Sequence, residues 1–185
     1  HTRSYLVPLV YAYWERFFKM TFAEFLRCVT LRGVTAMQLN NNLGQFLLKV
    51  KINDALKNSR IGRIQELAGK QIIEEAKQHY DSMHSWFSAP LQLLSPANLV
   101  ETESNVKYEV LDSNCKNFGI DIQGIKAHTE RAGRILFVQL NELVTFRNQI
   151  AHGEVFHPVT SEKWQTFKEF VLDLMNATQN HLYET

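Results

Sequence analysis

The sequence predicts an all-α fold, a bundle of about five to six helices. Apolar residues recur every three or four positions in six long segments, which is the period of a half-buried helix. Only 4 prolines and 8 glycines occur in 185 residues, and most of them fall between these segments. No run alternates apolar and polar residues for long enough to predict a strand.

The first predicted helix covers residues 5–31. Two apolar stripes run along it, one through Tyr13 and Met20 and the other through Phe18 and Phe22. A helix that is apolar on most of its circumference is typical of the centre of a bundle. We therefore expect this helix to be surrounded by the others.

Two further helices are predicted in the first half of the chain. Residues 36–58 place Leu43 and Leu47 on one face, and residues 64–87 keep helical spacing of apolar residues throughout. Residues 88–103 contain two prolines and are expected to form a loop, because proline interrupts helices.

The second half of the chain contains three predicted helices. A short one over residues 105–118 is followed by a glycine, a residue that commonly ends helices. The clearest helix covers residues 129–152. The last is capped by Thr160 or Ser161 and extends to about Leu182. Burial of the apolar stripes of all six segments would hold the bundle together.

The composition indicates one globular domain over residues 1–185, because 185 residues are about one domain's length. The chain is 45% hydrophobic, which favours a folded core over disorder. Lys and Arg total 20 and Asp and Glu total 19, so the formal net charge is +1. This balance excludes a surface that is basic overall, so any contact with nucleic acid must be local.

Cysteine usage and the distribution of charge bear on the compartment. Cys28 and Cys115 lie far apart and form no Cys-x-x-Cys pair, which favours a reducing, cytoplasmic location and gives no structural zinc site. The sequence leaves open whether these two form a disulfide. The longest stretch without a charged residue, residues 82–100, is too polar and too interrupted by proline to span a membrane, so no membrane association is expected.

One charged residue interrupts the apolar stripe of the clearest helix. Arg147 falls on the face that carries the apolar residues Leu136, Leu140, Leu143 and Ile150. Burying an isolated guanidinium costs free energy. We therefore expect Arg147 to have an anion, a polar partner or a wet cleft beside it.

His152 lies five residues after Arg147, about 7.5 Å along the helix axis and roughly 140° around it. Asn148 and His152, four positions apart, share a face. Arg147 and His152 can converge only if the arginine side chain bends or the helix ends near His152, and Gly153 predicts such an end. An imidazole titrates near neutral pH, so it can take and return a proton.

These residue types suggest chemistry on an RNA phosphodiester. The 2′-hydroxyl of RNA is a nucleophile that a histidine can deprotonate, while an arginine binds the phosphate and its developing charge. Such a reaction needs no metal and leaves a 2′,3′-cyclic phosphate. Two copies related by a two-fold axis would double the set of groups. In the structural alternative, Arg147 pairs with Glu142 or another carboxylate, and His152 caps carbonyl groups at the helix end.

Three segments resemble sequences of the HEPN superfamily. Residues 147–154, RNQIAHGE, are similar to its Arg-Asn-x-x-Ala-His-Gly signature. Residues 4–19, SYLVPLVYAYWERFFK, resemble the Tyr-x-x-Trp-Glu-Gly-Phe-x-Lys stretch of a bacterial HEPN-like nuclease family. Residues 101–121, ETESNVKYEVLDSNCKNFGID, resemble the short helix that precedes the motif helix in that family. The matches follow the order of the family across most of the chain.

This resemblance implies a HEPN-like helical bundle, a homodimer formed through the motif helix, and metal-independent endoribonuclease activity without a cofactor. It also implies a toxin or anti-phage effector with an antitoxin or defence-system partner. Arg147 and His152 would be catalytic, and Asn148 would orient or hydrogen-bond the RNA substrate. The match begins within the first helix, which leaves room for a further helix ahead of residue 1.

Two alternatives to the enzyme remain open within the same resemblance. One is a non-catalytic HEPN-like module that binds RNA, a nucleotide or a partner protein. The other is a structural dimerisation domain within a defence complex. RNA binding without a cyclic-phosphate product would favour the first alternative over the ribonuclease.

A basic cluster elsewhere in the chain is a candidate RNA-phosphate track. It places five basic residues within fifteen positions: Lys49, Lys51, Lys57, Arg60 and Arg63. The alternative is a solvated helix face and loop, which places no demand on function.

Other side chains are expected to be structural. His79 and His84 are five positions apart, which is a poor spacing for metal ligands on a helix, so no metal site is expected. Aromatic side chains can stack on bases, but the long apolar helix that carries Tyr11, Trp14 and Phe18 favours a place for them in the core.

Overall fold

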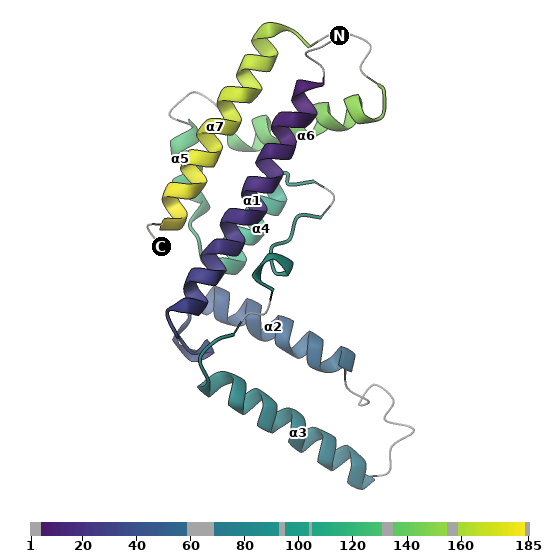
Figure 1. Cartoon of the computed structure of the whole chain (residues 1–185), viewed down its shortest axis with the longest axis vertical. Helices are drawn as coiled ribbons and strands as arrows, with labels where there is room; N and C mark the ends of the chain where they lie inside the picture. Colours follow the sequence, from purple (N-terminus) through teal and green to yellow (C-terminus); the bar gives the residue numbers. More distant parts are fainter. Residues whose placement is uncertain are drawn as a thin grey trace. The chain divides into compact units, whose positions relative to one another are not determined.

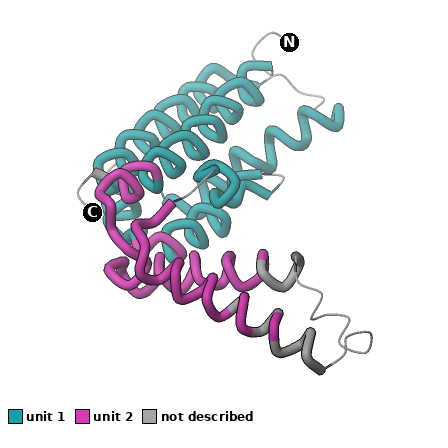
Figure 2. The backbone as a smooth tube through the Cα atoms, turned by 60° about the horizontal axis from the view of Figure 1, so that its bottom comes forward, with its two compact units in different colours: residues 1–26, 95–116, 120–185 teal, residues 27–94, 117–119 magenta. Residues whose placement is uncertain are grey.

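A computed structural model describes residues 5–58, 69–92, 95–103, 105–130, 135–154 and 159–183. Within these ranges the secondary structure is helical, with seven α-helices, α1 to α7, and no strand (Figure 1). The predicted all-α fold is confirmed. The chain divides into two compact units, which Figure 2 colours separately. The expectation of a single domain stays a prediction.

The first unit comprises residues 1–26, 95–116 and 120–185 (teal in Figure 2). It holds most of α1 (Leu6–Leu31) and α4 (Tyr108–Phe118), together with α5 (Ile122–Glu130), α6 (Leu136–Ala151) and α7 (Ser161–Tyr183). Each helix contributes fully buried side chains to one core, among them Trp14, Leu111, Ile125, Leu140 and Phe170.

Helix α1 buries one face, not most of its circumference. The buried residues recur at steps of four and three: Val7, Tyr11, Trp14, Phe18, Phe22 and Leu26. The predicted stripe through Tyr13 and Met20 is wrong, because these side chains are 61% and 59% exposed. Both predicted stripes are apolar, so periodicity could not decide which of them the rest of the fold would cover. The expectation that Tyr11, Trp14 and Phe18 lie in the core is confirmed.

The second unit comprises residues 27–94 and 117–119 (magenta in Figure 2) and contains α2 (Asn41–Asn58) and α3 (Gly69–Ser88). The predicted start of the second helix at residue 36 is wrong, because Ala36–Gln38 is a separate 3₁₀ turn. The side chain of Asn40 starts α2 by accepting a hydrogen bond from the backbone N–H of Leu43, at 2.9 Å, which is an N-cap.

Two other predicted boundaries move by a few residues. Helix α3 ends at Ser88, close to the predicted end at residue 87, while the predicted start over residues 64–68 lies outside the described residues. The short helix begins at Tyr108, three residues later than predicted. The described residues between α3 and α4 are largely non-helical, as predicted, apart from the 3₁₀ turn Pro96–Asn98.

The predicted continuous helix over residues 129–152 is wrong. Thr129 belongs to the last turn of α5, where its hydroxyl donates to the carbonyl of Lys126 at 2.9 Å. Ile135 has extended backbone angles and immediately precedes α6. Helix α5 itself was missed, although the carboxylate of Asp121 accepts a hydrogen bond from the N–H of Gln123, a local signal of a helix start.

Helix α5 packs closely on α7. A Cβ placed on Gly124 would lie 2.4 Å from the imidazole Cε1 of His181, so a larger residue at this position would require that ring to move. The contact fixes the C-terminal helix to the segment that leads into α6. Helices α5 and α7 are thereby held together within the first unit.

The structure bears on two further expectations, which concern a membrane-spanning helix and a disulfide between the two cysteines. No helix in the described part of the chain combines the length and the apolar character that crossing a bilayer requires. Cys28 is exposed and Cys115 is buried, and no disulfide joins them. Burial, with smaller contributions from Asp112 and Asp121, raises the pKa of Cys115 to about 12.

Candidate functional site at the end of helix α6

The predicted apolar stripe of α6 is present, and Arg147 interrupts it. Leu136, Leu140 and Leu143 are fully buried on this stripe. Arg147, one turn further along, is only half-buried. The guanidinium therefore lies at the edge of the core, where neighbouring residues decide whether it has hydrogen-bond and charge partners.

Arg147 is held by an aromatic ring and an amide. Its guanidinium carbon lies 5.3 Å from the centre of the Tyr11 ring, a cation–π contact. Its Nη1 donates a hydrogen bond to Oδ1 of Asn148 at 2.9 Å. Glu142, the structural alternative, forms an ion pair with Lys163 instead. In the described part of the chain, no carboxylate lies within ion-pair distance of Arg147.

Tyr11 is fixed by contacts with the segment before α4. Its side chain is buried, and its hydroxyl accepts a hydrogen bond from the N–H of Val106 at 2.6 Å. Trp14, three residues further along α1, donates from Nε1 to the carbonyl of the same Val106 at 3.1 Å. Burial raises the pKa of Tyr11 to about 12, so the phenol stays neutral at physiological pH.

The Val106 segment is itself anchored on both sides. The buried amide of Asn114 donates to the carbonyl of Glu101 at 2.8 Å, and its oxygen accepts from the N–H of Glu101 at 3.1 Å. On the other side, the N–H of Tyr108 donates to Oδ1 of Asn141 in α6 at 3.0 Å. The three segments that resemble the HEPN family therefore meet around Tyr11, Val106 and Arg147.

His152 has a different environment. Helix α6 ends at Ala151, and His152 is its C-cap residue. Gly153 has φ +71°, its N–H donates to Ile150, and the N–H of Glu154 donates to Gln149, which together form a Schellman turn. The predicted helix end at Gly153 is confirmed.

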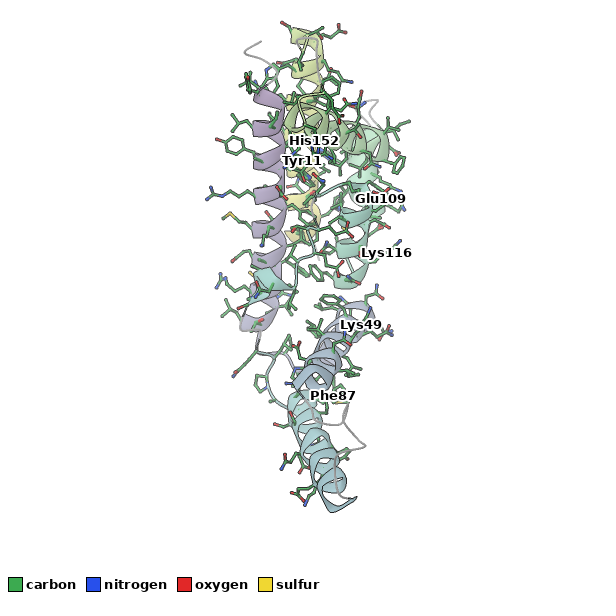
Figure 3. The ribbon with its side chains drawn as sticks, turned by 90° about the vertical axis from the view of Figure 1, so that its right-hand side faces the viewer. Tyr11, Lys49, Phe87, Glu109, Lys116 and His152 are labelled. Carbon is green, nitrogen blue, oxygen red and sulfur yellow. The ribbon has the colours of Figure 1, made fainter. Side chains whose placement is uncertain are left out.

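The imidazole of His152 is exposed (labelled with Tyr11 in Figure 3). Among the described residues it makes no hydrogen bond or ion pair through its side chain. The imidazole therefore caps no carbonyl among the described residues, and the structural alternative is not adopted there. The backbone N–H of His152 donates to the carbonyl of Asn148 at 2.9 Å. The structure thus joins Arg147 to Asn148, and it records no side-chain contact between either of them and His152.

Sequence reasoning missed the part played by Tyr11. The signal was present, because Tyr11 and Trp14 are three positions apart and so lie on one face of a helix. They also belong to the segment that resembles the Tyr-x-x-Trp stretch. What the sequence could not supply is their shared partner, Val106, which is 95 positions away from Tyr11.

The basic cluster is only partly described. Lys49 is exposed and Lys51 is half-buried on α2. Lys57 lies in α2 but its side chain is outside the described residues, as are Arg60 and Arg63. Its role as an RNA-phosphate track stays a prediction.

Clusters of metal-ligating side chains are absent from the described ranges. No group of three or more His, Cys, Asp and Glu side chains there could hold a metal ion. His84 is exposed and stacks on Tyr80, with ring centres 6.2 Å apart. The side chain of His79 lies outside the described residues.

Fold and site together define an α-helical protein whose motif helix ends in Arg-Asn-x-x-Ala-His-Gly. A family model described as RiboL-PSP-HEPN matches residues 1–184, and the chain belongs to this HEPN family. No curated protein and no solved structure matches it. HEPN domains are often ribonucleases, so membership suggests a ribonuclease-type module.

Proposed function

We propose that this chain is a metal-independent endoribonuclease of HEPN type that acts as a homodimer. The observation that carries the proposal is the state of Arg147. Its guanidinium is half-buried and held by Tyr11 and Asn148, and the described residues supply no carboxylate to neutralise it. A cation prepared in this way suits an anionic ligand, and a phosphodiester is one of the anions that a guanidinium can bind through two parallel hydrogen bonds.

The proposed reaction uses the 2′-hydroxyl of the RNA as nucleophile. His152 removes the proton as the 2′-oxygen forms a bond to phosphorus, and the bond from phosphorus to the 5′-oxygen breaks. A proton from an imidazolium is donated to the leaving 5′-oxygen, and the product carries a 2′,3′-cyclic phosphate. Arg147 binds the phosphate and the charge that develops on it, and Asn148 orients the substrate.

A second copy of the chain would complete the site. The reaction needs both a base and an acid, and the motif of each subunit offers one histidine. His152 also lies about 140° around the helix from Arg147. In a two-fold dimer formed through α6, the same helix face meets its own copy and the catalytic set is doubled. The exposed position of His152 at the end of α6 is compatible with such a shared cleft.

The broader biological role follows from the family resemblance alone. We infer a cytoplasmic toxin or anti-phage effector, with RNA as substrate and an antitoxin or defence-system protein as partner. The basic residues of α2, beginning with Lys49 and Lys51, are proposed to contact RNA phosphates outside the cleavage site.

The test of the ribonuclease is an incubation of the purified protein with RNA in the presence of EDTA. The expected result is cleavage, with 2′,3′-cyclic phosphate ends on the 5′ fragments. Absence of cleavage with and without added divalent cations would reject the enzyme. Cleavage that EDTA abolishes would reject the metal-independent mechanism.

The shared site is tested by mixing wild-type protein with an inactive double variant. Wild-type protein and an Arg147→Ala/His152→Ala double variant, unfolded together and refolded, form mixed dimers in which one subunit keeps both groups and the other has neither. If both copies build the cleft, these mixed dimers are inactive, and activity falls as the square of the wild-type fraction. Activity that falls in direct proportion to the wild-type fraction, in a sample shown to be dimeric, would place each set within a single subunit.

A second candidate function is a non-catalytic module that binds RNA, a nucleotide or a partner protein. The exposed imidazole of His152, which has no side-chain partner among the described residues, favours it, because a catalytic base is usually oriented by a neighbour. RNA binding by the wild-type protein without any cyclic-phosphate product would identify this function.

A further inference from the structure

We propose that Tyr11 is a positioning residue for Arg147, which it holds in the orientation that receives a phosphate of the RNA. The inference rests on the proposed binding of RNA at Arg147. The face of the Tyr11 ring carries the guanidinium, whose central carbon is 5.3 Å from the ring centre. The hydroxyl at the edge of the same ring accepts a hydrogen bond from Val106.

The ring cannot easily move away from this place. Val106 presents its N–H to Tyr11 and its carbonyl to Trp14, so the backbone of one residue links two side chains of the same helix face. The two aromatic side chains are fully buried and belong to the 26-residue helix α1. A ring that is hydrogen-bonded at its edge and buried in the core keeps a fixed orientation, so it can support a flexible arginine side chain.

The support leaves the guanidinium free to bind. A guanidinium has five N–H donors in a fixed plane. Among the described residues, one donor is engaged by Asn148 and the ring covers one face, so the remaining donors are available to an anion. An aromatic face attracts the cation but does not neutralise it, unlike the carboxylate of an ion pair.

The neutral state of Tyr11 agrees with a residue that holds Arg147 and leaves its positive charge available to a ligand. Burial raises its pKa to about 12, and the hydroxyl is occupied by the Val106 N–H. A phenolate at this place would compete with a phosphate for Arg147, whereas the neutral ring does not. The same contact therefore operates across the whole physiological pH range.

The experiment compares three variants of the full chain: Tyr11→Leu, which removes the ring, Tyr11→Phe, which keeps the ring and loses the hydroxyl, and Phe22→Leu. Phe22 is a matched control, because it is a fully buried aromatic residue of the same helix, three turns away from Tyr11. Binding is measured with an RNA oligonucleotide whose 2′-hydroxyls are methylated, which blocks the nucleophile, and cleavage is measured with unmodified RNA.

Tyr11→Leu is expected to weaken binding about tenfold, the effect of losing a partly buried cation–π contact, and to lower kcat/KM by at least the same factor. Tyr11→Phe and Phe22→Leu are expected to stay within about threefold of wild type, because the first keeps the ring face and the second leaves Arg147 untouched. If Tyr11→Leu does not fold, Tyr11→Met takes its place, since methionine fills irregular gaps.

A double variant separates positioning from general loss of structure. If Tyr11 acts through Arg147, Tyr11→Leu has no further effect on RNA binding in an Arg147→Ala background. An equal loss in both backgrounds would overturn the inference, as would a Tyr11→Leu protein that matches Phe22→Leu.

The outcomes distinguish this inference from the proposed function. Wild type that cleaves RNA while Tyr11→Leu behaves like the control rejects the role of Tyr11 and leaves the ribonuclease standing. Wild type that binds RNA without cleaving it rejects the ribonuclease, and the binding series still decides on Tyr11. Wild type that neither binds nor cleaves RNA rejects both.

Discussion

The two ends of the motif on α6 have contrasting environments. Arg147 is held from three directions by its own chain, through the stripe of α6, the ring of Tyr11 and the amide of Asn148. His152, only five residues later, is exposed at a helix end and has no side-chain partner among the described residues.

Under the proposed mechanism, this difference means that one chain prepares the proposed anion-binding half of the site and leaves the proposed proton-transfer half to be completed. A guanidinium at the edge of a core needs partners for the fold to be stable, so folding positions it. An exposed imidazole costs nothing when unpartnered, so only a substrate or a second copy would orient it. The variants below test this contrast, beginning with the largest expected effect.

His152→Ala is expected to lower RNA cleavage by about 100-fold or more, the usual loss of a general acid or base. The unfolding midpoint is expected to stay the same, because the side chain is exposed and unpaired within the described residues. Cleavage assays and thermal unfolding measure the two effects. His84→Ala, at another exposed histidine, is the control. Cleavage equal to wild type would remove His152 from the mechanism.

Arg147→Ala is expected to lower cleavage by about 100-fold, as for the loss of a preorganised group that stabilises transition-state charge. Unlike His152→Ala, it is also expected to reduce the free energy of unfolding by about 1 kcal/mol, because the contact with Tyr11 is lost. Arg147→Lys should recover part of the stability but little of the activity, since lysine lacks the planar fork. Full activity of Arg147→Lys would contradict two-pronged binding of the phosphate.

Alkaline pH is expected to destabilise the Arg147 side of the motif through Tyr11. The folded phenol keeps its proton to about pH 12, whereas an unfolded one ionises near 10.0, so the folded state binds more protons between these values. Stability therefore falls as pH rises above 10. Between pH 9 and pH 11, Tyr11→Phe should lose about 1 kcal/mol less than wild type in urea unfolding. The buried thiol of Cys115 contributes equally in both proteins.

An equal alkaline loss in wild type and Tyr11→Phe would contradict the raised pKa of Tyr11. The comparison is made at each pH on the same day and salt concentration, so that only the phenol differs. A parallel curve for Cys115→Ala separates the thiol from the phenol.

Gly153→Ala is expected to cost about 1 kcal/mol, because the left-handed backbone at φ +71° is strained for alanine while the space around a Cβ is open. Gly33→Ala is a matched control, with φ +66° and equally open space outside the motif. Both should lower the unfolding midpoint by a few degrees, and only Gly153→Ala should also reduce cleavage, because it moves His152. Equal activity of the two variants would show that the Schellman turn does not position the histidine.

Glu142→Gln is expected to have the smallest effect. It removes the ion pair with Lys163, in which the two side chains are 37% and 31% exposed, so less than about 1 kcal/mol of stability should be lost. Cleavage should stay within about twofold of wild type, because Glu142 is not the partner of Arg147 in the described structure. A large loss of activity would revive the alternative in which Glu142 sets the state of Arg147.

The interruption of the α6 stripe by Arg147 and the end of that helix at Gly153 were both predictable. Each depends on residues within a few positions of one another, which are brought together by the helix itself. The break between α5 and α6 was not predicted, because the apolar spacing of residues 129–152 continues across it. Local spacing does not record where the chain must turn so that Gly124 can approach His181.

The sequence by itself determined the α-helical class, the charged interruption at Arg147 and the helix stop after His152, because all three are encoded by short-range spacing. The tertiary structure alone decided which face of α1 is buried and that its Tyr11 contacts Arg147. These choices depend on contacts such as that between Tyr11 and Val106, which join residues 95 positions apart. Two apolar faces of one helix are equivalent until the rest of the chain packs against one of them.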